Sequence, residues 1–141
     1  MRKKLIMLTA MALVIFSLAA VANAAIFSSK YISNCYANPS AISDGITISI
    51  DISATDTMNV LGAQTIIVQE RASSSSRWTS IDTLSSDDYD NMLTTNSRKH
   101  NANINYYGTT SGYQYRAKVY FYAEKGGYDT HEYITAGVTA K

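Results

Sequence analysis

The chain has 141 residues, a net charge of +1 at pH 7, a pI near 7.8 and one cysteine. This length suffices for one hydrophobic core and is too short to expect two domains. The single cysteine excludes an internal disulfide, and the absence of a basic cluster after residue 24 argues against nucleic acid or an anionic membrane surface as the partner.

The N-terminus has the three-part pattern of a secretory signal peptide. Basic residues 2–4 precede an apolar run from Leu5 to Val21, and Ala22 and Ala24 supply small side chains at the −3 and −1 positions of a signal peptidase site. The run is slightly shorter than the ~20 residues of a membrane-spanning helix, so the sequence favours a cleaved signal helix over a membrane anchor. We expect cleavage after Ala24, or alternatively one residue later.

Removal of the signal, residues 1–24, changes the charge of the protein. The signal contains three basic residues and no acidic residue, so residues 25–141 keep nine basic and eleven acidic residues and a net charge of −2. We therefore expect a secreted, weakly acidic single domain over residues 25–141, with no membrane span after cleavage.

Strand signals begin after Lys30. A weak strand is expected from Tyr31 to Ala37, ended by Asn38-Pro39 because proline donates no backbone hydrogen bond. Residues 45–53 alternate strictly, with every isoleucine on one face, which predicts a half-buried strand. Residues 57–64 are expected to hold at most one turn of helix.

The middle of the chain predicts a hairpin. Residues 65–71 are apolar on both faces at their centre, as expected of a central strand, and the serines at 73–76 connect them to a strand from Trp78 to Leu84. A polar, acidic stretch follows over residues 85–91. We expect Met92-Leu93 to return to the core.

The last third alternates again. Residues 101–107 and 113–122 each place apolar and polar side chains on opposite faces, and the second run is the longest predicted strand. Glycines at 108–112 and 126–127 predict turns, and residues 128–135 predict a final strand. About seven short strands at near-regular spacing predict an all-β fold, a Greek-key β-sandwich.

The stretch before the longest strand resembles the corresponding part of fibronectin type III and immunoglobulin-like domains. Residues 108–115 match the approach to the penultimate strand of those folds, where a tyrosine hydroxyl binds back to the preceding loop. Tyr115 fits that position best and Tyr113 second, and Trp78 fits the strand that follows the third one. The resemblance implies structural roles for Tyr115 and Trp78, and it implies no function.

A second resemblance covers most of the chain after the signal. The spaced pattern is similar to an uncharacterised family of small secreted proteins from Gram-positive, clostridia-like bacteria, and it consists of Thr57-Met58, Leu61-Gly62-Ala63, Ile66, Gln69-Glu70, Trp78, Met92-Leu93, Gly108-Thr109, Gly112, Tyr115-Arg116-Ala117, Val119 and Phe121-Tyr122-Ala123. This resemblance implies export and a β-sandwich, and it supplies no activity.

Few residues suggest chemistry. His100 and His131 lie on different predicted elements, so we expect no metal site and no cofactor. The acidic loop Asp87–Asp90 lacks the alternating ligands and central glycine of a calcium loop, although calcium there remains an alternative. Cys35 lies in an apolar setting, which favours a buried side chain; the alternative is an exposed thiol that forms a dimer.

The tyrosines are the unusual feature of the composition. Tyr120 and Tyr122 fall on the outward face of the longest strand beside Arg116 and Lys118, and Tyr107 is expected to face outward on a neighbouring strand. Tyrosine and arginine are favoured at binding surfaces, but aromatic pairs also stabilise sheets without any ligand.

The sequence therefore predicts a secreted, non-enzymatic binding module whose partner is an extracellular protein or glycan. One alternative is a self-associating cell-surface or matrix protein. A small secreted hydrolase is less favoured, because no nucleophile elbow or catalytic triad is evident.

Overall fold

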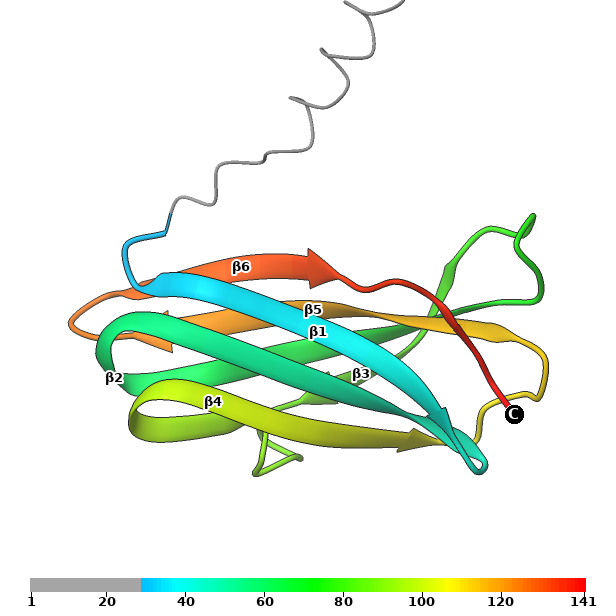
Figure 1. Ribbon diagram of the computed structural model, residues 1–141, viewed down its shortest axis with the longest axis horizontal. Helices are drawn as coiled ribbons and strands as arrows, with labels where there is room; N and C mark the ends of the chain where they lie inside the picture. Colours follow the sequence, from blue (N-terminus) through cyan, green and yellow to red (C-terminus); the bar gives the residue numbers. More distant parts are fainter. Residues whose placement is uncertain (1–28) are drawn as a thin grey trace, which may run out of the picture.

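The computed structural model describes residues 29–141, and all regular elements of this range are strands (Figure 1). The predicted signal peptide, residues 1–24, and its cleavage site at Ala22 and Ala24 lie outside the described residues. All strand pairs are antiparallel. The strands are β1 (Ile32–Ile42), β2 (Gly45–Arg71), β3 (Thr79–Ser85), β4 (Leu93–Tyr107), β5 (Gln114–Glu124), β6 (Tyr128–Ile134) and β7 (Val138–Thr139).

Strand β2 is 27 residues long and doubles back on itself, which curls the whole sheet (Figure 1). Its first half, residues 45–53, pairs with β1 and with the end of β4. Its second half, from residue 58 onward, pairs with the start of β4, with β5 and with β3. Strand β4 follows β2 around the same bend. The result is one curled antiparallel sheet whose inner surface encloses the core.

The alternation of side chains predicted from the sequence is present in both long runs. The isoleucines of residues 46–52 are at most 3% exposed, and the polar residues between them face outward. In β5 the residues Tyr115, Ala117, Val119, Phe121 and Ala123 are buried while their neighbours are half-buried. The buried side chains of both runs belong to one core cluster. The period of two residues therefore places the alternate side chains of each run on the outer face.

Gly62 allows β2 and β4 to approach each other after the bend. Its φ is +151°, and a Cβ atom at this position would lie 2.1 Å from the backbone oxygen of Met92. The neighbouring Ala63 N–H donates to the same oxygen at 2.8 Å. Met92 is fully buried, which confirms its expected return to the core.

Several local expectations were wrong. Residues 57–64 form strand and no helical turn, because they pair with β4 and β5 on their two sides. Strand β1 continues through Pro39 to Ile42. Within residues 29–141 it pairs only with β2, and an edge strand tolerates a proline. Strand β4 begins at Leu93, well before the predicted residue 101.

The hairpin of β2 and β3 is confirmed, with Trp78 just before β3 rather than inside it. Strand β7 was not predicted from the sequence, and it pairs with the start of β5.

The chain before β1 is attached to β6. Ser29 Oγ and the Tyr31 N–H both donate to Asp129 Oδ2, at 2.6 and 2.7 Å. Ser29 Oγ also accepts from the Ile32 N–H at 2.9 Å. This attachment lies at one end of the long axis of the sheet, and the C-terminus lies toward the other end (Figure 1).

Candidate binding face

Four of the five residues predicted for the binding surface lie together. Arg116, Lys118, Tyr120 and Tyr122 alternate along the outer face of β5, and all four are half-buried. Their row runs between β2 on one side and β6 on the other. The outward orientation predicted from the period of two is therefore present in the structure.

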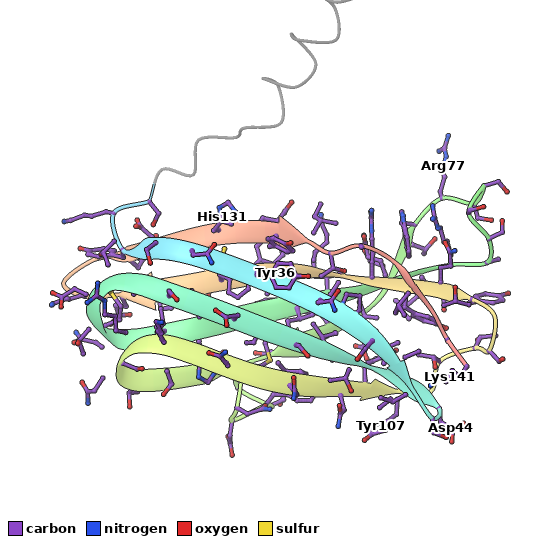
Figure 2. The ribbon with its side chains drawn as sticks, in the orientation of Figure 1. Tyr36, Asp44, Arg77, Tyr107, His131 and Lys141 are labelled. Carbon is purple, nitrogen blue, oxygen red and sulfur yellow. The ribbon has the colours of Figure 1, made fainter. Side chains whose placement is uncertain are left out.

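Tyr107 lies elsewhere. It pairs with Gly45 in the first half of β2, and Figure 2 places it beside Asp44 at one end of the sheet. The expectation that its strand neighbours β5 was wrong. The end of β4 pairs with the first half of β2, whereas the part of β2 that pairs with β5 is its second half. Tyr107 is 62% exposed on a separate outer face.

Trp78 forms a stack with two arginines at one end of the row. The guanidinium carbons of Arg71 and Arg116 lie 4.3 and 4.5 Å from the centre of the indole ring. Arg71 Nε donates to Gln114 Oε1 at 2.7 Å, and Arg116 Nε donates to Gln69 Oε1 at 2.8 Å. These hydrogen bonds fix the planar guanidinium groups for cation–π contact with the ring.

Burial is the main cause that lowers the pKa of Arg116, and the nearby positive charge of Arg71 adds to it. Guanidinium groups stay protonated in proteins, so the stack holds two positive charges close together. Two fixed cations beside a half-buried indole ring favour an acidic or carbonyl-rich partner group.

The centre of the row is balanced by an acid on β6. Lys118 Nζ lies 3.8 Å from Glu132 Oε2, and both side chains are partly exposed. Glu132 also accepts a hydrogen bond from Tyr120, which raises the pKa of this tyrosine. The phenol therefore remains a protonated donor at neutral pH.

Two tyrosines stack at the far end of the row. The rings of Tyr122 and Tyr128 lie 6.0 Å apart at an angle of 22°. Tyr122 Oη donates to Glu124 Oε2, and this hydrogen bond raises the pKa of Tyr122. Tyr128 is 68% exposed.

Sequence reasoning missed Tyr128, although a signal for it was present. The tight turn at Gly126 and Gly127 brings Glu124 opposite Tyr128, and the period of two then places Tyr128 on the same face as Tyr122. We call the set Arg71, Trp78, Arg116, Lys118, Tyr120, Tyr122, Tyr128 and Glu132 the aromatic face.

Tyr115 lies on the opposite side of β5 and is 1% exposed. Its hydroxyl accepts from the Thr110 N–H at 2.7 Å and donates to Glu70 Oε2 at 3.0 Å. The first of these hydrogen bonds is the one that the resemblance to immunoglobulin-like domains implies.

Cys35 has a half-buried side chain, and burial raises the pKa of its thiol to about 11. The thiolate is the reactive form, so this thiol is a slow partner in disulfide formation at neutral pH. The Cys35 dimer remains a prediction, and this environment weighs against it.

The histidines and the acidic loop were the residues weighed as metal ligands in the sequence. Within residues 29–141 there is no group of three or more His, Cys, Asp or Glu side chains that could hold a metal ion. His100 Nε2 lies 2.8 Å from the backbone oxygen of Asn91, and the Asp87 N–H donates to Ser85 Oγ. The loop Asp87–Asp90 is thus a turn with mostly exposed carboxylates.

Comparison with models of protein families gives no match for this chain. Comparison with curated proteins gives no significant match either. In the described part of the chain, no helix has the length and apolar character needed to cross a membrane. The function must therefore be argued from the residues of this chain.

Proposed function

We propose that this chain is an exported, non-enzymatic binding module that engages a partner protein through the aromatic face. The observation that carries the proposal is the continuous outer row on β5, with stacked tyrosines at one end and the Arg71–Trp78–Arg116 stack at the other. Tyrosine, tryptophan and arginine dominate the energetics of protein interfaces, because they combine rigid contact area with polar tips.

The charges and dimensions of the face favour a protein over a glycan. From Arg116 to Tyr122 the row extends about 20 Å, at ~3.4 Å per residue, which is long for a single sugar ring. It presents the cations of Arg71, Arg116 and Lys118 together with the carboxylate of Glu132. A protein surface can complement both signs of charge, whereas a neutral glycan carries no charge that would complement either sign.

The side chains of the face are already held by contacts within the protein. The guanidinium groups are fixed by glutamines, Tyr120 by Glu132 and Tyr122 by Glu124. Preorganised side chains lose less entropy when a partner binds, so the same contacts that stabilise the sheet also favour association.

We also infer that the curled sheet is an immunoglobulin-like Greek-key sandwich of about seven strands. The order of pairing supports this inference: β1, the first half of β2 and the end of β4 form one layer, while β3, the second half of β2, β5 and β6 form the other. The hydrogen bond from the Thr110 N–H to Tyr115 supports it further.

Export is part of the proposal and rests on the signal pattern of residues 1–24. The likeness to small secreted proteins of clostridia-like bacteria remains part of it as well. The intact mass of the protein collected from culture medium tests the export step. Cleavage after Ala24 gives a chain that starts at Ala25, and retention of residues 1–24 in a cell-bound form contradicts the proposal.

Binding is tested by cross-linking the purified protein to components of its native culture fluid and then measuring affinity for the captured protein. Tyr122→Ala and Tyr128→Ala are each expected to weaken binding at least tenfold, since an interface hot spot contributes ~2 kcal/mol or more. Tyr107→Ala is the matched control, because it removes a tyrosine about as exposed as Tyr128 from a different face. Equal binding by all three variants would exclude the aromatic face.

Self-association is the second candidate function, and the open edge of β3 favours it. Among the described strands, β3 pairs only with β2, and its residues 79–83 are exposed. An exposed strand edge is a template for pairing with another chain. Sedimentation with and without reductant tests this function: a dimer in both conditions indicates edge pairing, a dimer lost on reduction indicates Cys35, and a monomer in both contradicts self-association.

A further inference from the structure

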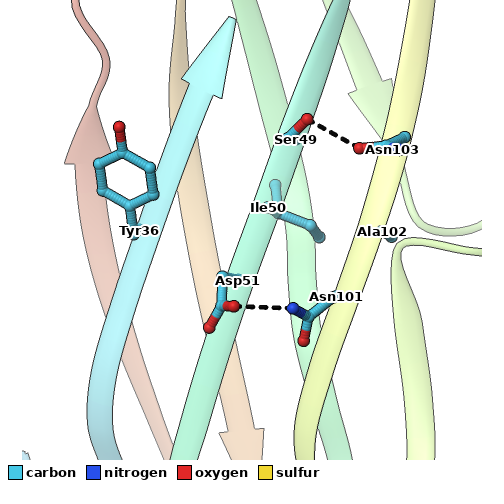
Figure 3. A pocket seen from close by; sticks show the side chains of 7 residues that line it. All are labelled: Tyr36, Ser49, Ile50, Asp51, Asn101, Ala102 and Asn103. Atoms are coloured by element: carbon cyan, nitrogen blue, oxygen red, sulfur yellow. Dashed lines mark hydrogen bonds between the residues drawn. The ribbon is translucent and has the colours of Figure 1, made fainter.

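A groove lies on the outer face of β1, the first half of β2 and the second half of β4 (Figure 3). Its volume is about 270 Å³. It is lined by Tyr36, Ser49, Ile50, Asp51, Asn101, Ala102 and Asn103. The proposal for the aromatic face uses none of these residues.

One wall of the groove consists of polar pairs that join β2 to β4. Ser49 Oγ donates to Asn103 Oδ1 at 2.7 Å, and Asn101 Nδ2 donates to Asp51 Oδ2 at 2.7 Å (Figure 3). The register places these side chains directly opposite each other, so both pairs are fixed across the strands.

These pairs keep hydrogen-bonding capacity for a ligand. A side-chain amide has one carbonyl oxygen and two N–H donors, and a carboxylate has two oxygens, so one internal hydrogen bond leaves other groups of each side chain available. Asn101 and Asn103 are both exposed. The wall therefore places planar hydrogen-bond donors and acceptors side by side. Such a row can bind a ligand that carries hydroxyl groups on adjacent carbon atoms.

Tyr36 forms the opposite side of the groove. It pairs with Asp51 across β1 and β2, and it is 50% exposed. Its ring makes an edge contact with Tyr133, with the centroids 5.7 Å apart and the planes at 71°. This contact holds the ring while part of its surface remains available for an apolar group to pack on.

Charge and size limit the ligand to a small neutral molecule. Asp51 is the one Asp, Glu, Lys, Arg or His among the lining residues, and it is already hydrogen-bonded to Asn101. The groove therefore lacks the cations that hold phosphate or carboxylate groups and the several carboxylates that hold a metal ion. Its volume of about 270 Å³ lies just below the ~300–1,000 Å³ of pockets for drug-sized ligands.

We propose that this Tyr36 groove binds one neutral pyranose ring of a glycan. The apolar C–H face of the sugar packs on Tyr36, and adjacent hydroxyl groups bind Asp51, Asn101 and Asn103. This site is independent of the protein-binding proposal, because it lies on a different outer face, so either proposal can fail without the other.

The test is an NMR titration of the isotope-labelled protein with the methyl glycosides of glucose, galactose, mannose and N-acetylglucosamine. We expect at least one sugar to shift the side-chain amide signals of Asn101 and Asn103, with a millimolar Kd typical of a single ring, or ~4 kcal/mol. Tyr36→Ala is expected to weaken this binding at least tenfold. Tyr36→Phe keeps the ring and is expected to retain it.

Tyr107→Ala is the matched control, since it removes a tyrosine from the same outer face at the end of β4 and is expected to leave the titration unchanged. If Tyr36→Ala fails to fold, Asn103→Ala replaces it with the same expected loss. No shift with any of the four sugars at tens of millimolar overturns the proposal. Shifts confined to other residues, or shifts that persist in Tyr36→Ala, overturn it as well.

Discussion

At the scale of single residues, Tyr115 shows how one hydroxyl can hold a loop to a strand. The hydroxyl accepts from the Thr110 N–H and donates to Glu70, and the ring around it is fully buried. Removal of this oxygen removes both hydrogen bonds. A hydrogen bond contributes about 0.5–1.5 kcal/mol, and one to a charged group such as the Glu70 carboxylate about 1.5–3 kcal/mol.

We therefore predict that Tyr115→Phe lowers the free energy of unfolding by about 1–3 kcal/mol. Urea denaturation followed by circular dichroism measures the change. Tyr107→Phe is the control, because that side chain is exposed, and it is expected to change stability by less than about 0.5 kcal/mol. Equal stabilities for wild type and Tyr115→Phe would show that the loop does not depend on this hydroxyl.

Gly62 gives a second prediction at this scale. Gly62→Ala requires both an unfavourable φ of +151° and a contact with the Met92 oxygen that the backbone must move to relieve. Gly126→Ala also requires an unfavourable φ, of +67°, but its Cβ would have no atom within 4 Å. The loss of stability in this variant therefore measures the backbone conformation alone.

We expect Gly62→Ala to destabilise the protein by about 1–3 kcal/mol more than Gly126→Ala does, as measured by thermal or urea unfolding. Comparable losses in the two variants would mean that β2 and β4 can separate at this point without cost.

At the scale of elements, the attachment of residues 29–31 to β6 depends on the ionised carboxylate of Asp129 and therefore on pH. Hydrogen bonds from Ser29 and from the Tyr31 N–H lower the pKa of Asp129. A carboxyl group whose pKa is lower in the folded state stabilises the fold above the unfolded pKa of ~3.9, and this stabilisation is lost as the pH falls through the folded pKa.

We predict that Asp129→Asn reduces stability at neutral pH, and that its difference from wild type shrinks as the pH falls below about 4. Urea unfolding at a series of pH values measures this difference. Asp88→Asn, in an exposed turn, is the control. A difference that stays constant across this range would contradict the role given to the carboxylate.

The elements also show what the sequence could and could not predict. The alternation in residues 45–53 and 113–122 is a local signal, so their buried and outward faces were predictable, and with them four residues of the aromatic face. The bend of β2 near residues 54–57 has no glycine or proline to mark it. The position of Tyr107 depends on that bend, and the sequence therefore assigned it to the wrong neighbour.

The Tyr36 groove escaped sequence reasoning for a related reason. Its residues come from three strands, and no local pattern records that Tyr36, Asp51 and Asn101 share one row. The polar faces of residues 45–53 and 101–107 were visible as alternation, but polar alternation alone predicts only exposure to solvent.

At the scale of the whole molecule, β2 connects nearly all of the sheet. It pairs with β1, β3, β4 and β5, and its two halves contribute to the same core cluster. If either half of β2 separates from the sheet, the core residues of the other half become exposed to solvent. Local opening of one half is therefore coupled to opening of the whole sheet.

We predict a single cooperative unfolding transition. In native-state hydrogen exchange, the slowest amides of residues 46–52 and of residues 66–68 should open with the same free energy, equal to that of global unfolding. A clearly lower value for the first group would mean that the β1 side of the sheet unfolds on its own.

The placement of the chain ends has a mechanical consequence. The described chain enters at one end of the long axis and leaves toward the other, and β1 lies along that axis (Figure 1). A pulling force across the ends therefore acts parallel to β1 and β2, and loads their shared hydrogen bonds simultaneously instead of opening them one after another. If the module is held at both ends, it should resist stretching better than a sheet that can be unzipped.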